Sequence, residues 1–434
     1  VQEAPIRMID LELYGGYFER IDVDRYAAVK YPGYSHKRGC FYDRELQETG
    51  QMMMNALRGE LIKCDVDVIE DIIITGLLVG EKGVRGATGI DYVGGRLITF
   101  RSKAVVLATG GAGQLYKLTT NPVESTGDGL AMAFRAGAEM VDMEMVQFYP
   151  LGLIHPGPKS LQGLNIGYEI LMPAGAVLLN DKREEFLGKH FPEGEILTRD
   201  LLSISICREI QEGRGTEHGG VYVDLSRVTW ATIESDPVLK MLIDFGIDPQ
   251  KTPVEVAPTA HSFLGGIRIN DRCETSVPGL YAAGEVTGGV HGSNRLAGNA
   301  LAEIQVFGAR AGKYAAEYAM SREILPLDRK QVESEQRFFS KDETSKPEPG
   351  ISRLSQLRES LRDLMIRYVG VVRNSRGLKE ALYHLASIRR RYRSNRPSTS
   401  ERYYRRILDA IETANLLTVA ELVTRSALSR TESR

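Results

Sequence analysis

Two segments of the sequence carry side chains that could bind one anionic group. His261 lies in PTAHSFLGGI, residues 258–267, just before an aromatic residue and paired glycines, and Arg295 lies in HGSNRLAGNALAE, residues 291–303. If both segments end at one edge of a sheet, the imidazole can donate one hydrogen bond and the guanidinium can form a bidentate fork to a carboxylate. A lone histidine is more often a structural residue. The prediction of a carboxylate site therefore depends on the two side chains converging.

A second candidate pair, Arg199 and Asp200, begins a segment with helical spacing, TRDLLSISICREIQEGRG, residues 198–215. Acidic residues often start helices and arginines often lie on their surface, so a structural role is the simpler alternative. The high pKa of a guanidinium makes it a poor acid. Arg199 can serve as a proton donor only toward a strongly basic carbanion, with a carboxylate relay that returns the proton.

Strand and glycine-turn patterns could place a large ligand near these residues. AVVLATGG, residues 104–111, predicts a buried strand that ends in a Thr-Gly-Gly turn, and GLYAAGEVTGG, residues 279–289, predicts another with Glu285 at its carboxyl end. Ligands bind at that edge of open α/β sheets. Small residues there let the backbone approach a cofactor, and a carboxylate can accept hydrogen bonds from ribose or ribitol hydroxyls. The alternative is a tight turn without a ligand.

Gly298 and Asn299 stand where the helix after this turn is expected to begin. The free backbone N–H groups and the positive end of the helix dipole would face the same sheet edge, where they suit an anionic ring. The alternative is a simple N-capped helix after a loop.

The composition limits the other possibilities. The chain has 434 residues, of which 42% are apolar and 26% are charged, which is ordinary globular composition. A formal net charge of -2 provides no basic field for nucleic acid, and no apolar run approaches the roughly 20 residues that cross a bilayer. The four cysteines form no CxxC pair and indicate neither a zinc site nor a disulfide framework. We therefore expect no metal site, no nucleic-acid partner, no membrane-spanning segment and a reducing compartment.

The distribution of strand, turn and helix patterns along the chain predicts an α/β protein with four parts. Strands and glycine turns mark a first and a third part that belong to one domain, and loops with short helices mark an inserted domain between them. Charged helical spacing marks the last part as a separate helical domain. The predicted parts are residues 1–148, 149–256, 257–322 and 323–434.

Two stretches of the last part are polar. KDETSKPEPG, residues 341–350, is predicted to be a linker or an exposed loop. The arginine-rich stretches RRRYRSNR, residues 389–396, and RYYRR, residues 402–406, are predicted to lie on solvated or partner-facing helices. No nucleic-acid-binding module surrounds them.

Several segments together resemble the flavoprotein subunit of succinate dehydrogenase and fumarate reductase, a family related to L-aspartate oxidase and the soluble flavin fumarate reductases. In family order they are ATGGAG, TGDGLAMAFRAGA, PTAHSFLGGI, GLYAAGEVTGGVHGSNRLAGNALAE, GVVRNSRGLKEAL and ANLLTVAELVTRSALSRTESR. The resemblance implies an FAD-binding three-layer α/β domain, an inserted α+β capping domain and a C-terminal helical domain. The family's N-terminal βαβ unit with its GxGxxG turn and its C-terminal tail are not found in this sequence, so we expect the cofactor domain to be incomplete.

The resemblance also implies a cofactor, FAD, and a mechanism. Hydride passes between flavin N5 and one carbon of a carbon–carbon double bond, and Arg199 exchanges a proton with the other carbon. Asp200 and Glu169 are the implied relay carboxylates, while His261 and Arg295 bind the conjugated carboxylate. The implied cofactor contacts are Thr109, Gly110, Gly111, Asp128, Glu285, Asn299, Ala300 and Leu301.

The sequence departs from the family pattern at the other end of the substrate. The histidine of the family's Gln-aromatic-His-Pro-Thr-Gly segment is Tyr149 here, and the threonine of its Thr-Glu-Gly-Cys-Arg segment is Tyr168. Two phenols can still donate to a carboxylate, but they are larger and neutral, and they also suit an uncharged or aromatic end. Ile204 replaces a second arginine that often follows the Arg-Asp pair. Fumarate or succinate is thus the leading expectation for the substrate.

We therefore expect an FAD-dependent oxidoreductase that interconverts a short unsaturated and a saturated carboxylic acid. Because no cysteine cluster is present for iron–sulfur ligation, an iron–sulfur subunit is the expected electron-transfer partner. The alternatives are an L-aspartate-oxidase-like enzyme, whose reduced flavin reacts with oxygen or fumarate, and a flavin-binding subunit with an altered substrate or without catalysis. The expected location is the cytoplasm, with attachment to the cytoplasmic membrane face only through partner subunits.

Overall fold

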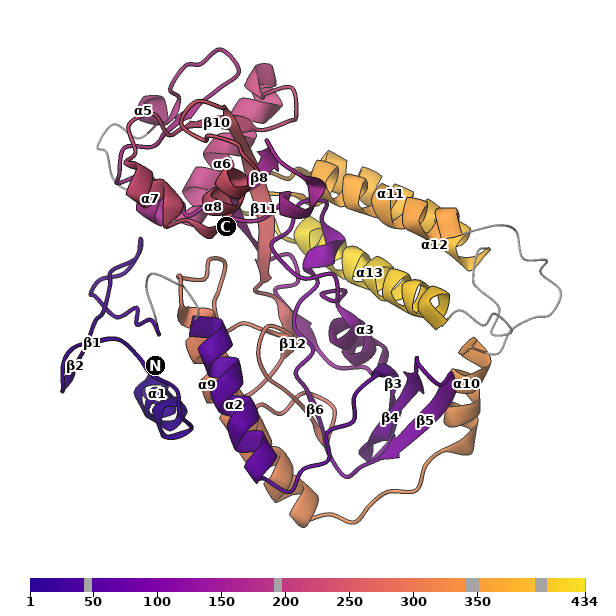
Figure 1. Ribbon diagram of the computed structural model, residues 1–434. Coiled ribbons are helices and arrows are strands. Elements are labelled where there is room, and N and C mark those ends of the chain that lie inside the picture. Colours follow the sequence, from indigo (N-terminus) through magenta and orange to yellow (C-terminus); the bar gives the residue numbers. More distant parts are fainter. Residues whose placement is uncertain (43–48, 191–196, 340–350, 395–403, 434) are drawn as a thin grey trace.

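The computed structural model describes residues 1–42, 49–190, 197–339, 351–394 and 404–433. These residues form an upper lobe, a lower body and a group of long helices on the right of the view (Figure 1). None of the helices in these ranges is long and apolar enough to span a membrane. The predicted linker at 341–350 and part of the arginine-rich stretches lie outside the described residues.

The upper lobe is built on a four-stranded antiparallel sheet in the order β8, β11, β10, β9. Its strands are β8 (Val146–His155), β9 (Val177–Leu179), β10 (Val221–Asp224) and β11 (Val254–Phe263). Its helices are α4 (Tyr168–Leu171), α5 (Leu187–His190), α6 (Arg199–Glu209), α7 (Trp230–Glu234) and α8 (Pro237–Asp244). The apolar side chains of sheet and helices share one core.

The sequence explains how α8 begins. The carboxylate of Asp236 accepts hydrogen bonds from the backbone N–H groups of Val238 and Leu239, both at 3.0 Å. Pro237 follows the cap in the first turn, where its fixed φ suits a helix and its missing N–H is not needed. Leu239 and Leu242 then point into the core of the upper lobe with no exposed surface.

The strands β8 and β11 form an antiparallel ribbon that runs from the upper lobe down into the lower body (Figure 1). Val256 pairs with Leu153 toward one end of the ribbon, and Phe263 pairs with Val146 at the other. Both strands run across positions 148 and 256, where the sequence predicts boundaries of the inserted domain. The capping and cofactor parts are therefore joined by continuous strands, and the boundaries themselves stay predictions.

The lower body contains three short sheets and the helix α3 (Asp128–Arg135). The parallel pair of β6 (Val105–Leu107) and β13 (Leu280–Ala282) confirms the two apolar strands predicted from the sequence. A mixed sheet contains β7 (Met140–Val141), β12 (Gly266–Arg268) and β14 (Thr287–Gly288). An antiparallel sheet contains β3 (Ile72–Gly80), β4 (Gly83–Asp91) and β5 (Arg96–Arg101).

The N-terminal segment packs against a long helix of the lower body. The first elements are α1 (Ala4–Leu13), β1 (Arg20–Asp22), β2 (Arg25–Tyr26) and α2 (Thr49–Lys63). The long helix is α9 (Asn299–Met320), which lies much later in the chain and is followed by α10 (Arg329–Phe339). Glu3 forms an ion pair with Arg310 of α9, which holds α1 beside that helix.

The C-terminal region is helical, as the sequence predicts. It contains α11 (Ile351–Val369), α12 (Ser375–Arg393) and α13 (Tyr404–Ser429). Leu357, Leu361 and Met365 are at most 1% exposed, and their spacing of four places them on one face of α11. Arg389 of the arginine-rich stretch pairs with Glu421 of α13 at 2.8 Å, so this arginine stabilises the helical packing.

Candidate active site

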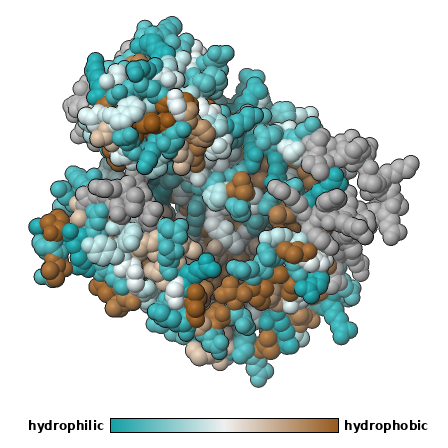
Figure 2. All heavy atoms as spheres, in the orientation of Figure 1, coloured by the Kyte–Doolittle hydropathy of each residue, from teal (hydrophilic) through white to brown (hydrophobic). Residues whose placement is uncertain are grey.

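Figure 2 shows a recess in the surface beneath the upper lobe. Four of the predicted site residues, Tyr168, Glu169, Arg199 and Arg295, meet between the upper lobe and the lower body. A small hollow there is lined from both lobes and from the N-terminal segment. Its lining is Pro32, Tyr168, Glu169, Thr198, Arg199, Asn294, Arg295, Leu296 and Ala297. The loop before α9, the starts of α4 and α6, and the N-terminal segment therefore converge at one place.

Arg199 is the first residue of α6 and pairs with Glu169 of α4. Its Nη2 lies 3.1 Å from Oε1 of the carboxylate, and each side chain is 12% exposed. The other oxygen, Oε2, accepts a hydrogen bond from the hydroxyl of Tyr149 at 2.5 Å. Burial and the charge of Glu169 raise the pKa of Tyr149 well above its ordinary value. The phenol therefore keeps its proton, and both oxygens of Glu169 are held by donors.

The family resemblance implies two relay carboxylates, Asp200 and Glu169, and the structure places only one of them in contact with Arg199. Asp200 is exposed, and its Oδ1 accepts a hydrogen bond from Nδ2 of Asn294 at 2.8 Å. Of the two, only Glu169 has a hydrogen bond to Arg199 among the described residues. Successive residues of a helix point about 100° apart, which explains why the neighbour of Arg199 does not reach the same group.

His261 lies on β11 beside the tyrosine of the neighbouring strand. Its ring centroid is 5.5 Å from that of Tyr149, and its Nδ1 is 2.9 Å from the hydroxyl oxygen of Thr120. Burial, and then the charges of Arg199 and Arg295, lower the pKa of His261 to about 3. The imidazole is thus neutral at physiological pH, and a hydrogen bond from Thr120 to Nδ1 would leave the proton on Nε2.

Arg295 is 7% exposed and has no salt bridge among the described residues. Its main-chain oxygen accepts a hydrogen bond from Nε2 of Gln147 at 2.7 Å, which fixes the backbone. Its side-chain Nε, however, has no hydrogen-bond partner. Burial, and then repulsion from Arg199, lower the pKa of this guanidinium to about 10. A buried cation without a partner is costly, and an anionic ligand would lower that cost.

Tyr168, the second departure from the family pattern, is 1% exposed. Its ring centroid lies 5.5 Å from that of Tyr149, with the planes 64° apart. Burial, and then the charge of Glu169, raise its pKa far above the ordinary value. Tyr149 and Tyr168 are therefore neutral phenols packed edge to face, and of the two Tyr168 lines the hollow.

The predicted cofactor residues at the strand ends lie against one another. A Cβ atom at Gly111 would stand 2.2 Å from Oε1 of Glu285, and one at Gly129 would stand 1.8 Å from Oγ1 of Thr109. A side chain at either place would therefore require Glu285 or Thr109 to move. Oε1 of Glu285 accepts the backbone N–H of Phe263 at 2.8 Å, and burial raises the pKa of this carboxyl. The neighbouring Gly110 has a positive φ and open space around it.

Asp128 differs from the other predicted cofactor residues. One carboxylate oxygen accepts a hydrogen bond from Thr126 at 2.8 Å, and the other accepts one from Asn415 of α13 at 2.6 Å. Asn415 also accepts a hydrogen bond from Arg135 at the end of α3. This network ties the start and the end of α3 to the C-terminal domain, and a cofactor contact for Asp128 stays a prediction.

The long helix α9 begins as the sequence predicts. Gly298 has a φ of 77° before the first helical residue, Asn299, and no side chain caps the helix. The hydroxyl of Tyr34 donates to the main-chain oxygen of Ala297 and holds the loop in place. Ala300 and Leu301 lie in the first turn, and Leu301 is 36% exposed. The amino end of α9 is thus open toward a ligand.

Three residues of the site were missed by the sequence analysis. Gln147 lies two positions before Tyr149 on β8, so period-two alternation puts both on one face and could have identified it. Thr120 and Tyr34 contact residues that are 141 and 263 positions away in the chain. No local signal marks either of them.

The residues at the strand ends fit FAD. The main chain at Gly110 has a positive φ and open space where a side chain would project, and the first turn of α9 offers backbone donors to the ring. Glu303, one turn further along α9, is buried with no partner for Oε1, and burial raises its pKa to about 7. A buried carboxyl oxygen without a partner is rare, and a ligand with donor groups would satisfy it.

The chain belongs to the flavoprotein subunit family of fumarate reductase and succinate dehydrogenase. A family model described as an FAD binding domain matches residues 1–301, and one described as fumarate reductase flavoprotein C-term matches residues 358–434. It is therefore a flavin oxidoreductase of the class that acts on CH–CH bonds, with FAD as its cofactor.

Individual relatives agree with this family. One subunit of the fumarate reductase (CoM/CoB) of Methanothermobacter marburgensis is 41% identical over 436 residues, which cover all of this chain and 78% of the relative. L-aspartate oxidase of Pseudomonas aeruginosa is 33% identical, over 94% of this chain and 73% of that protein. The apo form of the Mycobacterium smegmatis Sdh1 complex superposes with a TM-score of 0.87 at 32% identity, covering all of this chain and 73% of that one. These matches confirm the predicted fold class.

Proposed function

We propose that this protein interconverts a short 2-enoic acid and the corresponding saturated acid, as the catalytic subunit of an electron-transfer complex. One observation carries the proposal. A buried, unpartnered guanidinium, Arg295, lies in the same hollow as the buried pair of Arg199 and Glu169. An anion-binding group thus stands beside a proton-transfer pair. The relatives named as fumarate reductases support the same reaction type.

In this proposal Arg295 and His261 bind the carboxylate that is conjugated with the double bond. The guanidinium supplies the charge and the neutral imidazole supplies one hydrogen bond from Nε2. Both interactions strengthen as negative charge moves onto the carboxylate during the reaction, so they lower the barrier. In this proposal Thr120 is a positioning residue, because its hydroxyl, 2.9 Å from Nδ1 of His261, donates to that nitrogen and leaves the proton on Nε2.

The proton step is assigned to Arg199. When bound, reduced FAD would supply a hydride to one carbon of the double bond, and oxidised FAD would accept it in the reverse direction. Arg199 would give a proton to the adjacent carbon and regain one through Glu169, whose carboxylate at 3.1 Å first takes that proton from solvent. Tyr149 orients that carboxylate by donating to its other oxygen. Burial of all three side chains keeps bulk water from competing for the proton.

The electron partner in this proposal is an iron–sulfur subunit. The four cysteines of the chain lie at positions 40, 64, 207 and 273 and provide no cluster for iron–sulfur ligation. Electrons must therefore enter or leave FAD through another protein or a diffusible acceptor. Any attachment to a membrane is made by such partner subunits.

A reoxidation experiment tests the proposed function. The FAD-loaded full-length protein is reduced with dithionite, excess reductant is removed under anaerobic conditions, and single 2-enoic acids are added. Return of the flavin absorbance with formation of the saturated acid supports the proposal. Oxidation of L-aspartate with stoichiometric peroxide would replace it by the L-aspartate-oxidase alternative. Failure of every enoic acid would favour a flavin-binding subunit without catalysis.

A further inference from the structure

We propose that the substrate of this site carries a single carboxylate, and that it is a monocarboxylic 2-enoic acid with an uncharged far end. The inference rests on the proposed function, whose substrate class it narrows. It is carried by the balance of charges and donors around the hollow, taken together with the contacts that these groups already make.

The charged side chains that line the hollow sum to one net positive charge. Its lining includes two guanidinium groups, Arg199 and Arg295, and one carboxylate, Glu169. Arg199 is already neutralised, because its Nη2 lies 3.1 Å from Oε1 of Glu169 and both side chains are 12% exposed. Only the charge of Arg295 is left among the described lining residues, and one carboxylate balances it.

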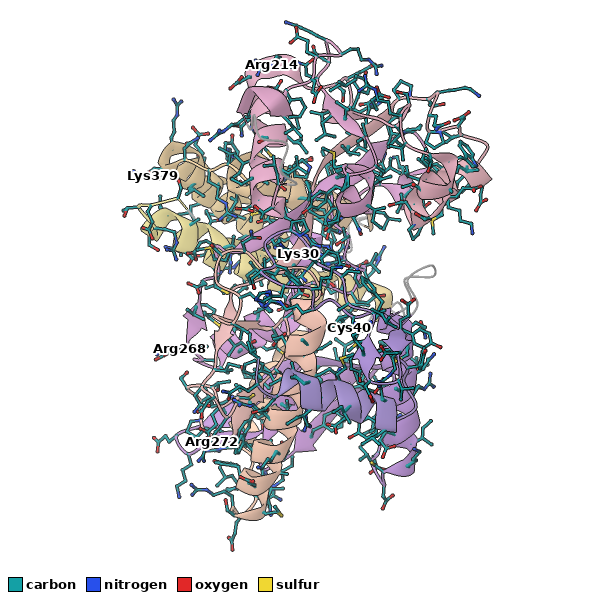
Figure 3. All side chains as sticks on the ribbon, turned by 90° about the vertical axis from the view of Figure 1, so that its left-hand side faces the viewer. Lys30, Cys40, Arg214, Arg268, Arg272 and Lys379 are labelled. Atoms are coloured by element: carbon teal, nitrogen blue, oxygen red, sulfur yellow. The ribbon has the colours of Figure 1, made fainter. Side chains whose placement is uncertain are left out.

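The other basic groups among the described residues do not line the hollow; the guanidinium of Arg38, for example, lies 4.4 Å from the ring centroid of Tyr34. Lys30 is exposed at the waist of the molecule in Figure 3, on the segment that supplies Pro32, and it does not line the hollow. Burial, followed by the positive charges nearby, lowers the pKa of His261 to about 3, and that of His291 to about 4. Both imidazoles are therefore neutral at physiological pH. Asp200 is exposed next to Arg199 and adds negative rather than positive charge.

The side of the hollow near Glu169 is unfavourable for a second carboxylate. Tyr149 and Tyr168 are 2% and 1% exposed and are neutral phenols. The hydroxyl of Tyr149 already donates to Glu169 at 2.5 Å, so it is not free for a substrate anion. A second carboxylate would lose its water and face the negative charge of Glu169, and the described lining residues offer no further cation to compensate. An ester, amide, alkyl or aryl group meets neither penalty, and an aryl group can pack against the two rings.

A matched pair of substrates tests the inference. Fumarate and monomethyl fumarate have the same double bond and the same first carboxylate, and they differ in the charge of the second. With the reduced, FAD-loaded protein we expect kcat/KM for monomethyl fumarate to exceed that for fumarate at least tenfold. Crotonate and cinnamate should also be reduced. A preference for fumarate would overturn the inference while supporting the proposed function.

A binding measurement separates the two proposals when neither compound reacts. The oxidised, FAD-loaded protein is titrated with butanoate and with succinate, and the perturbation of the flavin spectrum or the heat of binding is recorded. Tighter binding of butanoate supports a single-carboxylate site even if the proposed reaction fails. Tighter binding of succinate rejects it.

Variants at position 149 provide a second readout. Tyr149→His places an imidazole in contact with Glu169, whose carboxylate favours the protonated form, and we expect this cation to shift the preference at least tenfold toward fumarate. Tyr149→Phe removes the hydroxyl without adding a cation, so the preference for the monoanion should persist. If the histidine variant folds and leaves the preference unchanged, the charge argument is wrong. If it does not fold, the comparison of the two substrates on the unaltered protein decides.

Discussion

Arg199 of α6 and Glu169 of α4 form a buried ion pair, with 3.1 Å between Nη2 and Oε1. Each side chain is 12% exposed, so neither charge is well hydrated. Removal of one partner would leave the other buried and uncompensated, which is more costly than the loss of a surface pair. The pair therefore links the stability of the upper lobe to the proposed proton step.

Arg199→Ala tests the proton step directly. We expect loss of enoate reduction by a factor of about 1,000 or more, about 4 kcal/mol of transition-state stabilisation, because water is a poor substitute for a held donor. The bound FAD should keep its visible spectrum. Arg208→Ala is the matched control, since Arg208 is exposed on the same helix. Substantial residual turnover of Arg199→Ala would remove this residue from the mechanism.

Arg295→Ala should chiefly weaken substrate binding. The expected loss is about 2 kcal/mol or more, roughly thirtyfold in Kd, because a charge-assisted bond to a buried carboxylate is lost. The measurement is a titration of the oxidised, FAD-loaded protein with a saturated monocarboxylate. Arg376→Ala, on the exposed face of α12 with its side chain 91% exposed, should bind as the unaltered protein does. Equal affinities for all three proteins would place the carboxylate elsewhere.

The elements that the sequence predicts correctly depend on local patterns. The start of α9 at Asn299 follows from a glycine and the end of a turn, and the face of α11 follows from leucines spaced by three and four. The strands β6 and β13 read as short apolar runs before glycine turns. Each of these sequence patterns is contained in a window of about ten consecutive residues.

The contacts that tune the site could not be predicted in this way. The hydrogen bond from Tyr34 to Ala297 and the contact of Thr120 with His261 join residues far apart in the sequence. Their formation depends on how the lobes pack, which no local pattern encodes. The sequence also could not show which relay carboxylate contacts Arg199. Asp200 has the same functional group as Glu169, but its position on α6 points it away from Arg199.

The pKa of His261 makes the stability of the protein depend on pH. The imidazole is neutral in the folded protein down to about pH 3 but becomes protonated below pH 6.5 when unfolded. The unfolded state thus binds more protons in this range, and the free energy of unfolding falls as the pH is lowered. One such group accounts for roughly 2 kcal/mol between pH 6 and pH 4.

His261→Gln isolates this contribution, because glutamine does not titrate. Unfolding by urea at pH 6, 5 and 4 should show that the variant loses less stability than the unaltered protein across the series. His36→Gln is the control, since His36 is exposed and its replacement should leave the pH dependence as it is. Parallel curves for all three proteins would show that His261 is not held neutral by burial.

Asn415→Ala tests the link between the C-terminal domain and α3. Asn415 is 2% exposed, donates to Asp128 at 2.6 Å and accepts from Arg135 at 2.8 Å. Its loss removes a donor from the half-buried carboxylate and an acceptor from the guanidinium, so we expect unfolding to become easier by about 1 to 3 kcal/mol. Arg425→Ala, which removes an exposed pair on the same helix, should cost less than about 0.5 kcal/mol. Chemical denaturation of the three proteins decides.

The pairing of β8 with β11 has a consequence for how this pocket can change. Thr259 stands opposite Tyr149 and Ser262 stands opposite Gln147, so rungs of main-chain hydrogen bonds set the spacing of the side chains that project from the two strands. Substitution of one of these side chains leaves the main-chain hydrogen bonds between the two strands intact. Substitutions on β8 and β11 can therefore adapt the pocket to a different carboxylic acid while the backbone of the two strands stays the same.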